Sequence, residues 1–188
     1  MKQSGPARRG DGLSPTDPVL LAAPLEFISE DNLRERQICA VIEELANSAS
    51  FNRQAALTVL RFLNEELNVH VRDETEDLFP LLVRRCRPED AIERAISRIR
   101  TDHDETTRLL PEVRAILERT LDTGGNPSTE DSKMLMSFAT RMRRHLVAEN
   151  AILLPIARAR LTRVDLKKLS QRMRARRGLP PFSEASIA

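Results

Sequence analysis

Tryptophan and tyrosine are absent from the 188-residue sequence, and six phenylalanines are its only aromatic residues. So few aromatic side chains are unusual for a β-sheet protein and argue against a base-stacking surface for nucleic acid. No apolar run approaches the roughly 20 residues that a membrane-spanning helix needs, and residues 1–16 lack the apolar segment of a secretory signal. We therefore expect a cytoplasmic protein with no transmembrane segment and no nucleic-acid partner.

The sequence also lacks an excess of charge of one sign. It contains 30 basic and 28 acidic residues, so the net charge is only +2. Basic residues nevertheless gather near the C-terminus, where residues 158–177 hold nine of them and a single acid, Asp165. Such a segment either contacts a protein or an anionic surface, or packs its apolar stripe on the protein and leaves its charges in water. We favour the second interpretation.

Cysteine is scarce, with only Cys39 and Cys86. Two cysteines so far apart form neither a disulfide framework nor a CxxC metal motif. The two interpretations are inert, partly apolar side chains or redox-active thiols. Arginines on both sides of Cys86 would lower the pKa of that thiol if it is exposed. We favour inert side chains.

Apolar residues at helical spacing recur along most of the chain and predict an all-α protein. Ser128 and Thr162 are predicted helix N-caps because each precedes an acid by three residues. Ser29 is predicted to begin the first helix, and Pro111 to kink the third. The four long helices are expected at about residues 29–49, 52–85, 88–121 and 128–158.

Long amphipathic helices joined by short loops predict an up-down-up-down four-helix bundle. We assign residues 28–177 to this bundle, including a short extra C-terminal helix that begins at Thr162. Residues 1–27 and 178–188 carry glycine, proline or scattered charge without periodicity. They are expected to be flexible tails.

A motif of the form His-x3-Glu-x3-Leu-x-Pro occurs twice, beginning at His70 and at His145, with an offset of 75 residues. The third and last histidine, His103, follows an aspartate, and the corresponding pair in the first half is Asp31-Asn32. The halves therefore resemble two copies of one helical hairpin. Each hairpin should bring a polar residue of its first helix towards a His-x3-Glu pair on its second.

This spacing suits metal binding, because residues four apart lie on one face of a helix. Helical bundles hold paired metal ions with inward-facing glutamates and histidines from opposed helices. A set of imidazoles and carboxylates without thiolates suits iron, zinc or manganese. One His-x3-Glu pair alone is most often a surface contact, but the repetition at a fixed offset favours a metal site.

These residues resemble the hemerythrin-like HHE cation-binding family over about residues 28–177. The resemblance implies a bundle that binds two non-haem irons, bridged by two carboxylates and capped by histidines. Members of the family carry or sense dioxygen, respond to nitric oxide or redox state, or handle iron. The matching stretches are residues 31–39, 70–80, 84–90, 102–103 and 145–155. By matching position, the implied metal ligands are His70, Glu74, His103, His145 and Glu149, with the two glutamates as bridges.

The sequence departs from the family pattern at two positions. Asn32 stands where the family has a histidine, and Thr107 stands where the oxygen-carrying branch has a second histidine on the third helix. The Asn32 carbonyl is a weak ligand, and Glu35, about one turn away, is a candidate substitute or an outer hydrogen-bonding partner. These departures argue against reversible oxygen carriage. A di-iron site, a single ion of zinc, iron or manganese, and an empty site remain the alternatives.

We therefore expect a non-haem, di-iron metal-binding protein that senses oxygen, nitric oxide or redox state, or handles iron. The alternative is a metal-free helical interaction module that has lost part of the site. An enzyme is least favoured, because the sequence shows no added nucleophile, proton relay or substrate pocket.

Overall fold

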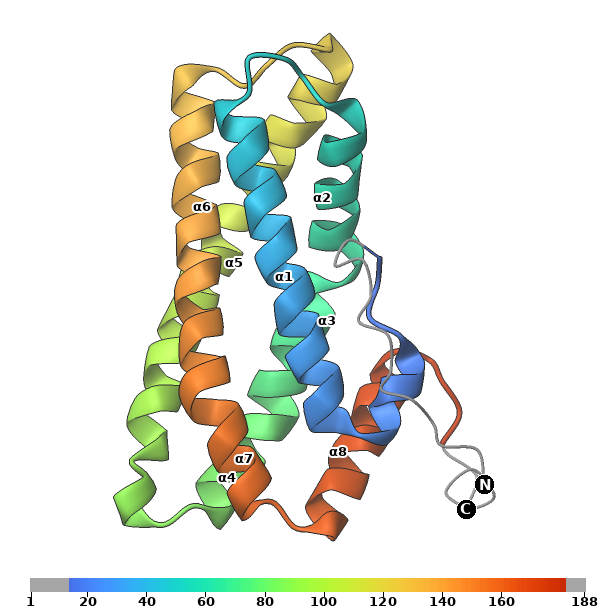
Figure 1. Ribbon diagram of the computed structural model, residues 1–188, viewed down its shortest axis with the longest axis vertical. Coiled ribbons are helices and arrows are strands. Elements are labelled where there is room, and N and C mark those ends of the chain that lie inside the picture. The colour runs from blue at the N-terminus through green and yellow to red at the C-terminus, as the bar shows by residue number, and fades with distance from the viewer. Residues whose placement is uncertain (1–13, 182–188) are drawn as a thin grey trace, which may run out of the picture.

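The computed structural model describes residues 14–181, and within this range the chain is helical without any strand. Four helical rods lie side by side, and a shorter helix packs near one end (Figure 1). The α-helices are α1 (Pro24–Asn47), α2 (Arg53–Glu65), α3 (Leu67–Arg72), α4 (Phe79–Arg85), α5 (Ile92–Thr123), α6 (Thr129–Ala148), α7 (Leu154–Arg160) and α8 (Arg163–Arg176). The shorter elements are the 3₁₀ turns η1 (Pro18–Ala22) and η3 (Pro88–Asp90), and the π-helical turns η2 (Asp73–Leu78) and η4 (Glu149–Leu153).

The four rods alternate in direction. α1 forms the first rod, α2 to α4 return as the second, α5 is the third, and α6 with α7 forms the fourth (Figure 1). Each rod packs against two others, because α1 and α5 both contact α2 and α6. The predicted all-α, up-down-up-down four-helix bundle with a short extra C-terminal helix is therefore confirmed.

The first helix begins earlier than predicted. α1 starts at Pro24, not at Ser29. Proline suits the first turn of a helix, where its missing N–H needs no partner. Residues 18–22, expected in the flexible tail, form η1 and pack against α1. Of the expected tails, residues 1–13 and 182–188 lie outside the described range.

The second rod is not the continuous helix predicted for residues 52–85. It breaks at Glu66, between α2 and α3. Arg34 of α1 holds the Glu66 carboxylate with two hydrogen bonds of 2.7 and 2.8 Å. The third rod, by contrast, continues as α-helix through Pro111.

Both copies of the repeated motif widen into a π-helical turn between the glutamate and the proline. In η2 the Phe79 N–H bonds to the carbonyl of Glu74, five residues back, and η4 repeats this bond in the second copy. A proline inside a helix lacks an N–H and collides with the carbonyl four residues earlier. We attribute the wider turns to Pro80 and Pro155, which begin the α-helical segments that follow.

The core consists of two apolar clusters separated by a layer of buried polar side chains. On α1 this polar layer lies between Ile28, in one cluster, and Ile38, in the other. The other rods repeat the arrangement at the same level. The flanking residues there are Leu67 and Leu78 on the second rod, Ile99 and Leu109 on the third, and Met142 and Leu153 on the fourth.

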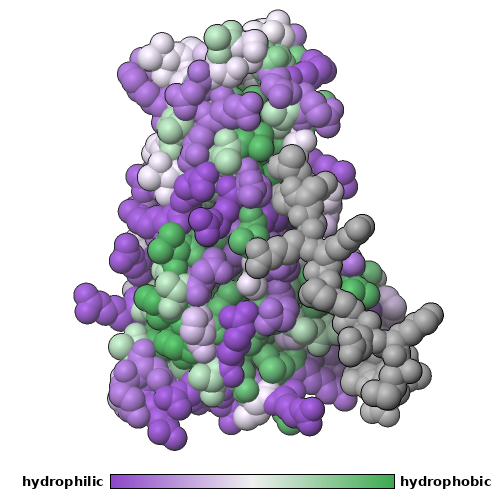
Figure 2. Space-filling view, viewed as in Figure 1, coloured by the Kyte–Doolittle hydropathy of each residue, from purple (hydrophilic) through white to green (hydrophobic). Residues whose placement is uncertain are grey.

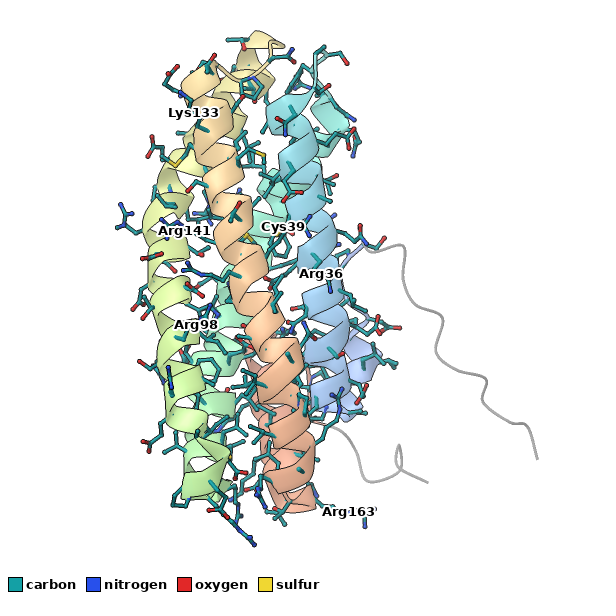
Figure 3. All side chains as sticks on the ribbon, turned by 60° about the vertical axis from the view of Figure 1, so that its left-hand side comes forward. Arg36, Cys39, Arg98, Lys133, Arg141 and Arg163 are labelled. Carbon is teal, nitrogen blue, oxygen red and sulfur yellow. The ribbon has the colours of Figure 1, made fainter. Side chains whose placement is uncertain are left out.

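α8 packs on the bundle with its apolar side, where Leu169 and Met173 are fully buried. Several of its basic residues bind acids of the bundle, including Arg172 with Asp77 at 2.7 Å and Arg176 with the same carboxylate at 2.7 Å. The apolar side of α8 packs on the bundle as expected, but Arg176, only 10% exposed, does not leave its charge in water as expected. Arg163, at the start of α8, projects away from the bundle (Figure 3).

On the face drawn in Figure 2, hydrophilic residues cover most of the upper part and hydrophobic residues gather in the lower half. The exposed apolar side chains include Val147 and Ile152 on the fourth rod. Within residues 14–181, no helix combines the length and the apolar character needed to cross a membrane.

Candidate metal centre

The five residues implied as metal ligands meet in the polar layer between the two apolar clusters. Each is at most 2% exposed. Three rods supply them, and the π-helical turns begin at or just before the two glutamates. The residues are His70 on α3, Glu74 on η2, His103 on α5, His145 on α6 and Glu149 on η4.

His103 lies between the two glutamates. Its Nε2 is 3.4 Å from Glu74 Oε2 and 3.5 Å from Glu149 Oε1. Within the motifs, Nε2 to carboxylate separations are 3.7 Å for His70 and 4.0 Å for His145. These distances are long for hydrogen bonds. Neighbouring atoms that ligate one ion at about 2.1 Å lie about 3–3.5 Å apart in tetrahedral or octahedral geometry, so the two distances from His103 suit atoms that bind the same ion.

Many of the polar atoms of this layer lack hydrogen-bond partners among the described residues. This holds for Nε2 of all three histidines and for both carboxylate oxygens of Glu74 and Glu149. Buried polar atoms are almost always paired in folded proteins, and each exception calls for an explanation. A cation accounts for all of these atoms at once, because each is a potential metal ligand.

Glu35 brings a third carboxylate into the layer from the first rod, α1. Its side chain is fully buried, with Oε1 3.3 Å from His70 Nε2 and Oε2 3.7 Å from His145 Nε2. Neither oxygen has a hydrogen-bond partner within the described part of the chain. From the sequence, Glu35 is only a candidate for a substitute metal ligand or for a hydrogen-bonding partner of the ligands.

Asn32 is fully buried in the same layer, and its amide nitrogen and oxygen have no hydrogen-bond partner in residues 14–181. The repeat predicted that Asn32 lies beside His70. The charged side chains of α1 that contact His70 are Asp31, the residue before, and Glu35, the residue one turn later.

Asp31 fixes the orientation of His70, a role that the sequence analysis did not assign. His70 Nδ1 lies 2.9 Å from Asp31 Oδ2, and Thr16 donates a 2.7 Å hydrogen bond to the other carboxylate oxygen. Histidines that ligate metals commonly donate their second ring N–H to such a carboxylate. The signal in the sequence was the Asp-x3-Glu spacing on α1, which places Asp31 and Glu35 on one face.

The surroundings of His103 differ from those of His70. Its ring stacks on Phe79, with centroids 6.1 Å apart, and meets the His145 ring edge-on at 4.9 Å. The preceding residue, Asp102, binds Arg144 instead of a histidine. Thr107 is exposed, so the position of the family's additional histidine faces away from the layer.

The carboxylates shift the pKa values of the buried histidines. Burial lowers the pKa of His70, but Glu35, Glu74 and Asp31 outweigh this effect and hold the pKa well above its ordinary value. The pKa of His145 is also raised, because neighbouring carboxylates outweigh its burial. The layer therefore attracts positive charge.

The two motif glutamates have pKa values shifted in opposite directions. Burial, and then the charge of Glu149, raise the pKa of Glu74 well above its ordinary value. Burial acts on Glu149 in the same sense, but the neighbouring histidines, first of all His145, bring its pKa down to about 2. Two carboxyl groups that interact in this way do not both ionise readily unless a cation offsets their charges.

A family model for the hemerythrin HHE cation binding domain matches residues 23–157. The chain belongs to the hemerythrin HHE cation-binding family. No curated protein matches the sequence. The match covers the four rods up to the middle of α7 and stops before α8, whereas the resemblance was expected to extend to residue 177.

Neither cysteine of this hemerythrin-like protein takes part in the clusters of potential ligands. Cys39 lies inside the bundle (Figure 3), and its burial raises the thiol pKa to about 12. Cys86 is half-buried, and its burial, followed by the charge of Asp90, raises the pKa of its thiol, which agrees with the favoured interpretation of an inert side chain. Two of its arginine neighbours, Arg84 and Arg85, bind Asp165.

The residues of the layer fit the cations that the family name implies. They supply imidazole nitrogens and carboxylate oxygens, are almost free of solvent, and form three overlapping sets of potential ligands. Such a set without sulfur suits iron, zinc and manganese. The overlap of the sets at His70 and at Glu149 is the arrangement expected where neighbouring ions share ligands.

Proposed function

We propose that this hemerythrin-family protein binds a pair of non-haem metal ions, with iron as the natural occupant, in the polar layer. The ligands are His70, Glu74, His103, His145 and Glu149. The observation that carries the proposal is the set of buried nitrogen and oxygen atoms without hydrogen-bond partners. An isolated buried carboxylate costs several kcal/mol, so a layer that contains more than one requires a counter-charge.

We further propose that the centre senses oxygen, nitric oxide or redox state, or handles iron, and does not carry oxygen reversibly. A bound iron pair would supply one-electron redox chemistry and binding of small diatomic molecules. The protein supplies the rest: the apolar clusters exclude water on both sides, and Asp31 orients the His70 ring. The first rod offers Asn32 and the third offers Thr107 at positions where an oxygen carrier has histidines.

Metal analysis by mass spectrometry tests the proposal on protein purified without a histidine tag from iron-rich medium. We expect about two ions per chain in the wild type and none in the double variant His70→Ala/His145→Ala. Thr107→Ala is the matched control, because this exposed side chain on α5 should leave the metal content unchanged. Circular dichroism shows whether each variant keeps its helices.

A second measurement does not depend on the double variant. Ferrous iron added without oxygen should raise the melting temperature of the metal-free wild type, because a ligand that binds only the folded state stabilises it. The metal site would be disproved if the wild type contains no metal and its melting temperature does not change with iron, zinc or manganese. The protein would then be a helical interaction module.

A further inference from the structure

We propose that Glu35 is a bridging ligand of the metal pair and takes over the contribution of the first helix, where Asn32 stands in place of a histidine. This inference rests on the proposed function. It assigns to the centre three histidines and three carboxylates, one of them from α1. The ligand set implied by the resemblance has no carboxylate from this rod.

The position of Glu35 between two histidines supports a bridge. Its two oxygens face different rings, Oε1 that of His70 at 3.3 Å and Oε2 that of His145 at 3.7 Å. These histidines belong to different copies of the repeated motif and therefore to different halves of the site. A carboxylate that offers one oxygen to each half is placed to bind one ion with each.

The buried Glu35 carboxylate faces two histidine rings but has no hydrogen-bond partner within residues 14–181. The side chain is 0% exposed and neither oxygen accepts a hydrogen bond from the described residues. Arg34, its neighbour in the sequence, is also buried but binds Glu66. A buried carboxylate without a hydrogen bond destabilises a fold, and a cation held together with His70 and His145 would offset this cost.

The negative charge of Glu35 makes it a better metal ligand from α1 than the neutral Asn32. Glu35, Glu74 and Glu149 together offer three negative charges, which balance most of the charge of two divalent cations. The Asn32 carbonyl is neutral and therefore adds nothing to this balance. Carboxylate oxygens are harder ligands than imidazole, so the third carboxylate favours retention of iron in its more highly charged, oxidised state.

The test compares three variants of the full-length protein by metal content and by competition with a chelator. Glu35→Gln keeps the size of the side chain and removes its charge, and we expect it to hold about one ion or fewer per chain and to lose more than tenfold in iron affinity. Asn32→Ala should stay close to the wild type in both measurements. Glu43→Gln is the matched control on the same helix, because Glu43 binds Arg143 at the periphery of the bundle.

Thermal melting separates a metal ligand from a structural residue. Metal-free Glu35→Gln should melt at the same temperature as the metal-free wild type or higher, because a buried charge is removed, and iron should raise its melting temperature less. If Glu35→Gln binds two ions with wild-type affinity, Glu35 is not a bridging ligand, but the proposed metal site is unaffected. Loss of helices in the metal-free variant would make Glu35 structural and overturn it as well. A wild type without metal would overturn this inference together with the proposed function.

Discussion

Asp31 is the residue of α1 that holds the ring of His70, one of the proposed ligands. Its carboxylate contacts His70 Nδ1 and leaves Nε2 directed at Glu35 and Glu74. The hydrogen bond therefore sets which ring nitrogen is free to bind a metal. Asp31 is also held by Thr16, so the segment before η1 helps to orient this histidine.

Replacement of Asp31 by asparagine should weaken metal binding without removing an ion. We expect iron affinity to fall by about 10–100-fold, the usual cost of losing such a partner, while saturating iron still fills the site. Chelator competition measures the affinity, and mass spectrometry the stoichiometry. Asp104→Asn is the control, because Asp104 is exposed beside His103. Loss of one ion in Asp31→Asn would instead identify Asp31 as a direct ligand.

The π-helical turns are the structural elements that distinguish the two motif-bearing rods. Each begins at or just before a glutamate of the polar layer and ends before a proline. One extra residue per turn rotates the following part of the helix relative to the part before it. The histidine and the glutamate thereby face the layer, while Leu78 and Leu153, which follow, still face the apolar cluster.

Alanine in place of Pro80 and Pro155 should let the wide turns relax towards α-helix. Because alanine restores an N–H and removes the collision with the earlier carbonyl, we expect helix content to hold and iron affinity to fall about tenfold or more. This estimate follows from the sensitivity of metal sites to small displacements of their ligands. Pro111→Ala is the matched control, since Pro111 lies in α5 without a π-turn. Equal metal binding in all three variants would show that the turns do not position the glutamates.

The N-terminus of α8 depends on Asp165, which completes a capping box with Thr162 and binds Arg84 and Arg85 of α4. The hydrogen bond from Arg85, helped by Thr162, holds the pKa of Asp165 well below its usual range. A carboxyl with a lowered pKa in the folded state stabilises the fold above its unfolded pKa. That stabilisation is lost as the pH falls towards the lower, folded value.

Asp165→Asn should therefore lower the free energy of unfolding at neutral pH, by about 1–2 kcal/mol for the cap and its charged hydrogen bonds. The difference from the wild type should shrink as the pH falls below about 4, the pKa of an unfolded aspartate. Urea denaturation of the metal-free proteins at several pH values measures this difference in the free energy of unfolding. A difference that is the same at neutral and acid pH would mean that the charge of Asp165 does not contribute.

At the scale of the whole molecule, the sequence predicted the class of fold and which side chains meet in the polar layer, but not the local geometry of the helices. Helical periodicity revealed the bundle, and the fixed offset between His70 and His145 revealed which faces point inward. The break at Glu66 and the π-turns escaped prediction, because both depend on contacts or strain that a periodic pattern does not show. The role of Asp31 and the burial of Glu35 depend on which face α1 turns towards the other rods. A rotation of α1 by the angle between two consecutive residues would bring different side chains into the polar layer.

The largest difference from expectation concerns α8, which the sequence presented as a basic segment with its charges in water. Its arginines instead bind the acids around the π-turn that begins at Asp73 and contains Glu74. Arg176 is only 10% exposed and contacts Asp73, Glu76 and Asp77. Arg177 adds a second contact to Asp73 at 2.6 Å. α8 therefore holds the π-turn that carries Glu74, one of the proposed ligands, although α8 lies outside the family match.

Two arginines of α8 allow this connection to be tested, because both contact Asp77 but differ in exposure. Arg176→Ala removes one of two arginine partners from both Asp73 and Asp77, which are nearly buried, and we expect a loss of roughly 1.5–3 kcal/mol. Arg172 is 68% exposed, so Arg172→Ala should cost less than about 1 kcal/mol. Urea denaturation gives both values, and chelator competition should show weaker iron binding in Arg176→Ala alone. If the two variants lose equal stability and bind iron like the wild type, α8 does not support the π-turn, and its packing is independent of the metal centre.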